Sequence, residues 1–479
     1  MHIRKLLVVL FAAAIVANVA ACAGGAAGTP KEPPVAQPDR TVTTEVLVVG
    51  GGGAGLSAAV EAATQGAKVV LIDKAANPGG TTMLAGGGID AAGSRLQQEA
   101  GITVTPEQFA QDIFEYGERK GDRDLIDILA NRSADAISFL EANGLAMKLA
   151  NPAVYATRHQ AEAGSTGAEI VKALLLAAQS KGVTIEVGVT AQELVVEDGK
   201  VVGVKAVDAD QKSVLYVAQA TILATGGFGA NPEMLAQYVT DYPGLGSDLV
   251  ARTATGDGLR MAREIGADLV AMGYVQAYPT VTVRGATLRG VEGAGAIMVN
   301  AEGKRFVNEL LDNNQVSKAM VAQDGKVFLL FAGEYKEANE NNVRAWGDQG
   351  ILLAADTLEE LADKMQVSYA NLQATLDEYN EAVKQGTDAR FGRARLPLTH
   401  EQPAYYALEI HAAAYTTLGG VKIDTNAQVL RSGQPIPGLY AAGEVAGGLF
   451  GTNKPGVTTA TQNIVFGRLA ADSAVKSLK

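Results

Sequence analysis

The sequence predicts an α/β fold with a Rossmann-like nucleotide-binding domain and a second domain. Three observations predict it. The chain has 479 residues, more than a single hydrophobic core usually serves. It contains 55 glycines, many in short runs, which suits a backbone that closely approaches a ligand. A strand, a glycine loop, a helix and a second strand follow one another over residues 45–73.

The N-terminal residues resemble a bacterial lipoprotein signal. A short basic stretch precedes an apolar run over residues 6–16, which is too short to span a membrane securely. Residues 19–22 then read Val-Ala-Ala-Cys, and Cys22 is the only cysteine of the chain. We therefore expect a signal peptide at 1–21 and a protein held at the cell membrane, outside the cytoplasm, by a lipid on Cys22. The alternative is an ordinary signal peptide with an incidental cysteine.

The segment after Cys22 is rich in Ala, Gly and Pro, and we interpret residues 22–43 as a flexible tether. The formal net charge of −12 makes a nucleic-acid partner unfavourable. A single cysteine excludes an intramolecular disulfide, a thiolate metal cluster and a covalent haem motif. We therefore expect no metal centre.

The nucleotide-binding pattern begins at a strand predicted over Glu45–Val49. It runs into the loop Gly50–Gly55, a helix over Leu56–Gln65 and a second strand over Lys68–Ile72. Glycine lets the backbone approach a pyrophosphate, and the free N–H groups of the helix N-terminus favour its negative charge. Asp73, at the end of the second strand, is placed to accept hydrogen bonds from a ribose.

Three further pieces specify the dinucleotide. A second glycine loop covers residues 77–88, a Thr-Gly-Gly turn follows a strand predicted over Ala220–Leu223, and a segment at 436–444 ends in Gly-Glu. In this order the pieces resemble the succinate dehydrogenase/fumarate reductase flavoprotein family, in its soluble flavocytochrome c and enoate reductase branch. The resemblance covers residues 44–479.

The resemblance implies FAD bound by a Rossmann-like domain at 44–272 and 416–479, with an inserted α+β capping domain at 273–415. Members in membrane complexes attach FAD covalently to a histidine, but Thr81 stands there in this chain, so we expect non-covalent FAD. The expected FAD-binding residues are Gly50, Gly52, Gly53, Ala54, Gly55, Asp73, Gly80, Thr81, Thr82, Gly86, Gly87, Thr225, Gly226, Gly227, Gly420 and Glu444.

At the substrate end the sequence departs from the family. Where the fumarate reductases carry two histidines, this chain has Tyr278 and Tyr415. Asn313 replaces the arginine that acts as the acid, and Lys454 replaces the arginine that holds a carboxylate. The family's proton-relaying Glu and Arg, three residues apart, appear here in the opposite order.

That reversed pair is Arg289 and Glu292. It is either a surface ion pair or a sign that Arg289 points into the site. We expect Tyr278, Arg289, Tyr415 and Lys454 to be the catalytic and substrate-binding residues, although each tyrosine could instead be structural. The resemblance places His159 near the flavin, and we interpret it as local structure.

A fumarate clamp needs two charged groups, and arginine and lysine do not substitute freely there. We therefore expect an FAD-dependent reductase of an α,β-unsaturated acid or enone other than fumarate, serving in anaerobic respiration. Its electrons would come from an external cytochrome or flavin protein. Two alternatives stay open: a dehydrogenase of the 3-ketosteroid type, and an electron-transfer lipoprotein without its own substrate.

Overall fold

The computed structural model describes residues 37–479, and a mixed eight-stranded sheet forms the base of the nucleotide-binding part. The strand order is β17-β18-β9-β1-β2-β6, with β8 paired to β9 and β7 paired to β8. Neighbouring strands from β18 to β6 are parallel. The strands are β1 (Arg40–Val49), β2 (Val69–Asp73), β6 (Thr184–Val187), β7 (Thr190–Glu197), β8 (Lys200–Val207), β9 (Ser213–Leu223), β17 (Gln428–Arg431) and β18 (Gln434–Ala441).

Strand β1 lies between two parallel neighbours, which explains the apolar run at its C-terminal end. Residues 46–49 are buried, as expected of a parallel strand covered on both faces. The strand begins earlier than the sequence pattern suggested, because Arg40 to Thr44 pair in register with β9. Residues 40–43, which we expected in the tether, therefore belong to the sheet.

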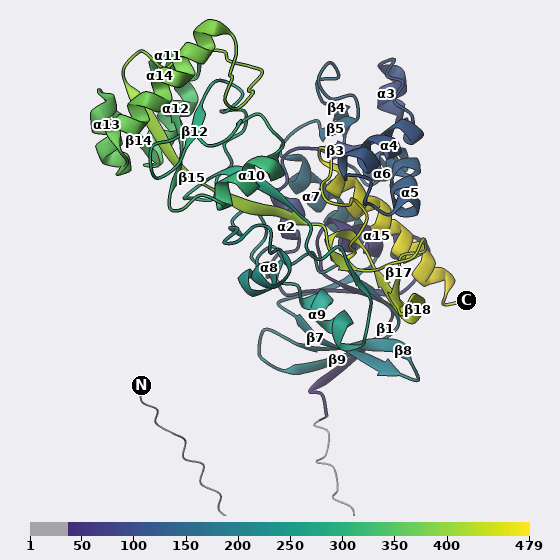
Figure 1. Ribbon diagram of the computed structural model, residues 1–479. Coiled ribbons are helices and arrows are strands. Elements are labelled where there is room, and N and C mark those ends of the chain that lie inside the picture. Colours follow the sequence, from purple (N-terminus) through teal and green to yellow (C-terminus); the bar gives the residue numbers. More distant parts are fainter. Residues whose placement is uncertain (1–36) are drawn as a thin grey trace, which may run out of the picture. The chain divides into compact units, whose positions relative to one another are not determined.

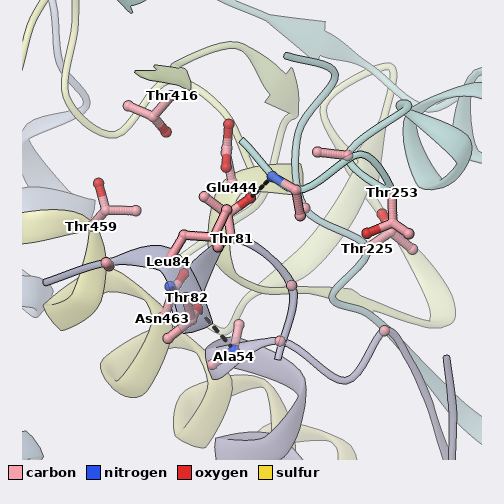
Figure 2. A pocket seen from close by; sticks show the side chains of 18 of the residues that line it. Ala54, Thr81, Thr82, Leu84, Thr225, Thr253, Thr416, Glu444, Thr459 and Asn463 are labelled. Carbon is pink, nitrogen blue, oxygen red and sulfur yellow. Dashed lines mark hydrogen bonds between the residues drawn. The ribbon is translucent and has the colours of Figure 1, made fainter. Parts of the chain in front are cut away.

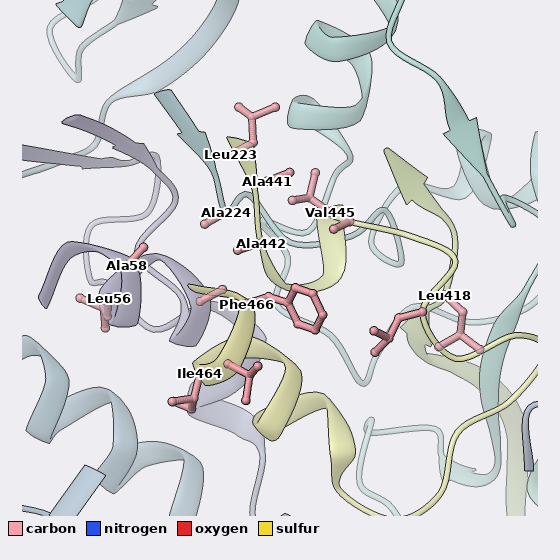
Figure 3. Close-up of a cluster of buried hydrophobic side chains, with 14 of the residues drawn as sticks. Leu56, Ala58, Leu223, Ala224, Leu418, Ala441, Ala442, Val445, Ile464 and Phe466 are labelled. Carbon is pink, nitrogen blue, oxygen red and sulfur yellow. The ribbon is translucent and has the colours of Figure 1, made fainter. Parts of the chain in front are cut away.

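Helix α1 (Gly53–Thr64) follows β1 directly and begins within the glycine loop rather than at Leu56. It packs closely against α15 (Thr458–Lys476) and also contacts α7 (Thr166–Ser180). Gly467 permits this approach, since a Cβ there would overlap the carbonyl of Ala54. Figure 3 shows small side chains, among them Ala58 on α1 and Ala441 and Ala442 at the end of β18, together with the larger ring of Phe466 on α15.

A second sheet forms the inserted unit. It has five strands in antiparallel pairs, with β15 at its centre. In Figure 1 the green helices α11–α14 gather around β12, β14 and one end of β15. The elements are β11 (Val275–Thr282), β12 (Ile297–Val299), α10 (Asn313–Val321), β13 (Val327–Phe331), α11 (Gly333–Ala338), α12 (Glu340–Asp348), β14 (Leu352–Ala355), α13 (Leu358–Met365), α14 (Tyr369–Gln385) and β15 (Tyr405–Thr417).

The predicted α/β class with an inserted α+β unit is confirmed. Strand β15 runs to Thr417, past the expected boundary at residue 415, and the domain limits themselves stay a prediction. The other elements are α2 (Gly80–Leu84), β3 (Ile89–Asp90), α3 (Arg95–Glu99), α4 (Pro106–Tyr116), α5 (Arg123–Asn131), α6 (Ser133–Ala142), β4 (Met147–Leu149), β5 (Arg158–Ala161), α8 (Pro232–Tyr238), α9 (Asp257–Glu264), β10 (Leu269–Val270), β16 (Gly420–Val421) and the 3₁₀ turn η1 (Gly443–Val445).

Within residues 37–479, no helix combines the length and the apolar character needed to cross a bilayer. The same residues contain no group of three or more His, Cys, Asp or Glu side chains that could hold a metal ion. Cys22 and the expected signal peptide lie outside the described residues.

Candidate active site

The largest set of predicted site residues meets in one cavity of about 560 Å³. Its walls come from the glycine loop before α1, from α2, from the Thr-Gly turn after β9 and from the start of α15. The inserted unit adds the end of β15 and the loop at 285–289. Figure 2 shows Thr81, Thr82 and Glu444 between Thr225 and Thr253 on one side and Thr416 and Thr459 on the other.

The glycines of the first loop have two different roles. Some allow the chain to pack closely against itself, and one leaves space open for a ligand. Gly50 has φ +108°, and a Cβ there would overlap the carbonyl of Ala224. Gly55 packs against the carbonyl of Gly50 in the same way. Gly52 differs, because the nearest atom to an added Cβ is the Gly79 oxygen, 3.9 Å away. The protein therefore needs no glycine at 52 for its own packing, whereas a bound pyrophosphate would.

Helix α1 offers its N-terminus to this space, because Gly52 supplies no side-chain cap. Two hydroxyl oxygens in the cavity wall, those of Thr225 and Thr459, are buried and have no hydrogen-bond partner within residues 37–479. Buried polar groups are normally hydrogen-bonded, so these oxygens fit a polar ligand in the cavity. Thr82 Oγ1 accepts from the first N–H group of the helix, that of Gly53. The open glycine, the helix N-terminus without a cap from Gly52 and the unpaired hydroxyls all suit a dinucleotide.

Asp73 supports the glycine loop, because both of its carboxylate oxygens accept hydrogen bonds from backbone N–H groups. Its Oδ2 accepts from the N–H of Gly51 at 2.6 Å, and its Oδ1 accepts from the N–H of Ala75 at 2.7 Å. A carboxylate has about four acceptor sites, so capacity remains for a ribose hydroxyl. Asp73 lines the cavity, which keeps the predicted ribose contact available.

The second glycine loop is tied to the rest of the wall by its two threonines. Thr82 Oγ1 accepts from the N–H of Gly53 at 3.1 Å, and Thr81 Oγ1 accepts from the N–H of Ala251 at 3.1 Å. Thr81 lines the cavity where the sequence comparison placed a flavin-attaching histidine. A threonine has no ring nitrogen to form that bond, so non-covalent FAD stays our prediction.

Glu444 closes the cavity from the C-terminal part of the chain. Its Oε1 accepts from the backbone N–H and the hydroxyl of Thr417, at 2.7 and 2.8 Å. Burial raises the pKa of this carboxyl above its ordinary value. Gly227 packs directly against this pair, since a Cβ there would overlap both side chains. The carboxyl therefore joins the end of β15 to η1.

Most of the expected FAD-binding residues lie in the cavity wall, namely Gly50, Gly52, Gly53, Ala54, Asp73, Gly80, Thr81, Thr82, Thr225, Gly226 and Glu444. The other expected residues do not line it. Gly55, Gly227 and Gly420 instead allow close packing of the chain against itself, and a Cβ at Gly87 would press on Val457. Within residues 37–479, the one atom within 4 Å of a Cβ added at Gly86 is the hydroxyl oxygen of Ser165, at 3.8 Å.

The four residues expected at the substrate end form one connected group. The rings of Tyr278 and Tyr415 lie 6.3 Å apart, centroid to centroid, at 41° to each other. The guanidinium carbon of Arg289 lies 6.0 Å from the Tyr278 ring, and Lys454 Nζ lies 5.6 Å from the Tyr415 ring. The group therefore runs from Arg289 through Tyr278 and Tyr415 to Lys454, with the two rings between the two cations.

Arg289, Tyr415 and Lys454 line the cavity, and Tyr278 does not. Tyr278 thus stands behind Arg289 and Tyr415, and burial raises the pKa of its hydroxyl. The two residues of the reversed charge pair lie in different surroundings. Arg289 lines the cavity, whereas Glu292 does not, and burial raises the pKa of the Glu292 carboxyl. Arg393 holds this segment by donating to the carbonyls of Glu292 and Ala296.

Lys454 is the most deeply buried cation of the cavity wall, with 1% of its surface exposed. The one hydrogen bond of its ammonium within the described residues is a long one, 3.5 Å from Nζ to the Gly456 oxygen. Burial lowers its pKa to about 8, although the nearby carboxylates of Asp90 and Glu444 oppose that shift. Asp90 also fixes the loop by accepting from the N–H of Val457 at 2.8 Å. The buried ammonium is therefore held in place with one long hydrogen bond, and a buried charge with so few partners favours an anionic ligand.

Asn313 does not line the cavity and is the first residue of α10. Its neighbour Asn314, which the sequence analysis did not single out, pins β11 by accepting from Ala277 N–H at 2.8 Å and donating to the Val275 carbonyl at 3.0 Å. An amide in place of the family's acid leaves proton donation to another group.

His159 is buried, contacts Ser94 Oγ at 2.6 Å and lies outside the cavity wall, which fits a structural role.

Sequence reasoning missed a set of wall residues that no local pattern marks. They come from loops, helix ends and the end of β15, which reach the cavity only through the tertiary fold. Asp248, for example, belongs to an irregular loop and contacts His411 Nε2 at 2.8 Å. The missed polar wall residues are Lys74, Asp248, Thr253, Asp257, Thr287, Thr416, Thr459 and Asn463.

Comparisons with known proteins agree with this site. A family model described as "FAD binding domain" matches residues 45–459. The chain is 38% identical over 425 residues to the probable fumarate reductase Ifc3 of Shewanella frigidimarina, covering 87% of this chain and 72% of that protein. It is 35% identical over 435 residues to the urocanate reductase of Eggerthella lenta, covering 86% and 71%.

The solved open conformation of a flavocytochrome c3 fumarate reductase matches with a TM-score of 0.84 and 38% identity, over 92% of this chain and 79% of that one. These relatives share the FAD-binding fold and act on carbon–carbon bonds. The chain therefore belongs to the succinate dehydrogenase/fumarate reductase flavoprotein family, in its flavocytochrome c fumarate reductase-like branch, and is an FAD-dependent oxidoreductase that acts on CH–CH groups.

Proposed function

We propose that this protein reduces the C=C bond of an α,β-unsaturated acid or enone other than fumarate. The observation that carries the proposal is the connected group of Arg289, Tyr278, Tyr415 and Lys454, in which the family's histidines and clamping arginine are replaced. The urocanate reductase relative supports the idea that this branch has diverged in substrate.

The chemistry divides between cofactor and chain. Bound and reduced FAD would supply a hydride to the β-carbon of the alkene. Lys454 holds the substrate's carboxylate or carbonyl oxygen and stabilises the negative charge that develops there. The proton for the α-carbon comes from Arg289 or from a tyrosine hydroxyl, since Asn313 carries an amide, which is not an acid. Of these groups, Arg289 and Tyr415 line the cavity and Tyr278 lies behind them.

Two variants test the proton donor. Arg289→Gln and Tyr278→Phe, assayed on the enoate that the wild type reduces fastest, should identify it by a loss of about 10²–10⁴-fold in kcat in one of them. FAD content serves as the control for folding. Near-normal turnover in both variants, with full FAD, would remove Arg289 and Tyr278 from this role.

We further propose that the enzyme acts outside the cytoplasm as a respiratory reductase, anchored by a lipid on Cys22 and fed by an external cytochrome or flavin protein. The support is the lipoprotein-like box at residues 19–22. Cys22→Ala should move the protein from the membrane to the soluble fraction of the cell. A Cys22→Ala protein that still sediments with membranes would show that the anchor is elsewhere.

The 3-ketosteroid-type dehydrogenase is the second candidate, because a tyrosine, Tyr415, lines the cavity and a second, Tyr278, packs beside it with the ring centroids 6.3 Å apart. An assay separates the candidates. Turnover of enoates with reduced viologen supports the reductase. Turnover only of a steroid with an electron acceptor supports the dehydrogenase. Absence of both, in protein that carries full FAD, supports an electron-transfer role.

A further inference from the structure

At the substrate end of the cavity, two tyrosine rings separate two cationic side chains. Between Arg289 and Lys454 stand two phenol rings, 6.3 Å apart. Both tyrosines stay partly exposed although their chain neighbours Ala277, Pro279, Ala414 and Thr416 are buried. Each tyrosine therefore keeps part of its surface accessible, and Tyr415 does so in the cavity wall.

We infer that the substrate is a 3-arylpropenoate, whose aromatic ring lies against Tyr415 and whose single carboxylate is held by Lys454. The inference rests on the proposed function and names its substrate class. The reaction adds a hydride to the carbon that bears the aryl group and a proton to the carbon next to the carboxylate. The C=C bond becomes a single bond, and the external donor supplies the two electrons.

Charge supports one carboxylate rather than two. Lys74 also lines the cavity, but its ammonium contacts Asp257 at 2.6 Å and the Thr255 hydroxyl at 2.5 Å, so it is already paired. Arg289 lines the cavity too, but it is exposed, so water screens its charge. The ammonium of Lys454 is buried and, among residues 37–479, has only the Gly456 oxygen at 3.5 Å. It is therefore the cation with the strongest need of an anion, and its position 5.6 Å from the centroid of the Tyr415 ring sets where that anion lies.

The rings support an aromatic body. Aromatic pairs prefer offset or edge-to-face contacts with centroids about 4.5–7 Å apart, and each such contact adds to the gain from burying apolar area. Tyr415 can make such a contact with a substrate ring. A short alkyl enoate would leave that ring surface uncovered, so the site should discriminate by the group on the β-carbon.

The direct experiment is a substrate panel with FAD-loaded protein and reduced methyl viologen. We expect kcat/KM for cinnamate to exceed that for crotonate by about tenfold or more, from ring contact and added apolar burial. If crotonate is reduced as efficiently as cinnamate, the inference fails and the proposed function stands. If trans,trans-muconate is the best substrate, Arg289 and Lys454 hold two carboxylates and the inference also fails. If no enoate is reduced, the proposed function itself fails.

Variants at Tyr415 test the ring contact. Tyr415→Phe keeps the ring and should leave the cinnamate-to-crotonate ratio within about threefold of the wild type, whereas Tyr415→Ala should lower it about tenfold. Tyr369→Ala is the control, because Tyr369 is exposed on α14 and lies outside the cavity wall. An unchanged ratio in Tyr415→Ala, with normal FAD content, contradicts the inference.

Binding gives a readout without turnover. In the oxidised protein, 3-phenylpropionate should perturb the flavin absorbance, and Tyr415→Ala should weaken that binding about tenfold while Tyr415→Phe retains it. Equal binding of butyrate and 3-phenylpropionate to the wild type contradicts the inference. If Tyr415→Ala does not fold, the wild-type panel and the Tyr415→Phe ratio still decide.

Discussion

At the scale of single residues, Lys454 is the most informative departure. A lysine is a point charge whose pKa responds to burial, whereas an arginine remains charged at any working pH. Burial lowers the pKa of Lys454 to about 8. The replacement therefore changes both the geometry of the carboxylate contact and its dependence on pH.

Because only the ammonium form attracts a carboxylate, we predict that kcat/KM falls as the pH rises through about 8. The free enzyme's pKa governs this quantity, and the fall should approach tenfold per pH unit above it. Lys454→Arg should remain charged and lose that decline while FAD stays bound. A wild-type profile that is flat between pH 7 and about 10 would contradict the assignment of Lys454 as the substrate cation.

At the scale of elements, the glycine loop and α1 show how one short segment serves both fold and ligand. Gly50 and Gly55 are needed because chain atoms occupy the space beside them, whereas Gly52 leaves open the space where we expect the pyrophosphate. The loop is also held from outside by Asp73 and Thr82. The strand and the helix could thus fold correctly with a larger residue at 52.

We therefore predict that Gly52→Val folds but binds no FAD, since its side chain would occupy the pyrophosphate space. Gly347→Val is the matched control, because a Cβ at Gly347 meets no atom within 4 Å and the residue is exposed on α12. The measurements are flavin content and circular dichroism. A Gly52→Val protein with normal FAD would exclude the loop from pyrophosphate binding.

The second glycine loop carries its own prediction. Thr81 replaces an attaching histidine, so acid precipitation of the wild-type protein should release FAD intact into the supernatant. Flavin that remains with the precipitated chain would show a covalent link and would require another attachment residue.

At the scale of the whole molecule, the sequence predicted what local patterns determine. The βαβ unit and the wall residues Gly52, Thr81 and Glu444 follow from short motifs whose backbone requirements are local. Thr459 and Asn463 could not be found this way, because they enter the wall only when α15 packs against α1. The position of Tyr278 behind Tyr415 depends on the register of β11 and β15, which no motif encodes.

The central claim is that the departures at the substrate end changed the specificity of a fumarate reductase-like enzyme. Losing a charge-assisted hydrogen bond to a carboxylate costs about 1.5–3 kcal/mol, so two losses lower catalytic efficiency by about 10²–10⁴-fold.

The most direct test is kcat/KM for fumarate against a panel of monocarboxylate enoates, using FAD-loaded protein and reduced viologen. We predict that fumarate is poorer than the best enoate by about 100-fold or more. Reduction of fumarate as efficient as that of any other enoate would contradict the account.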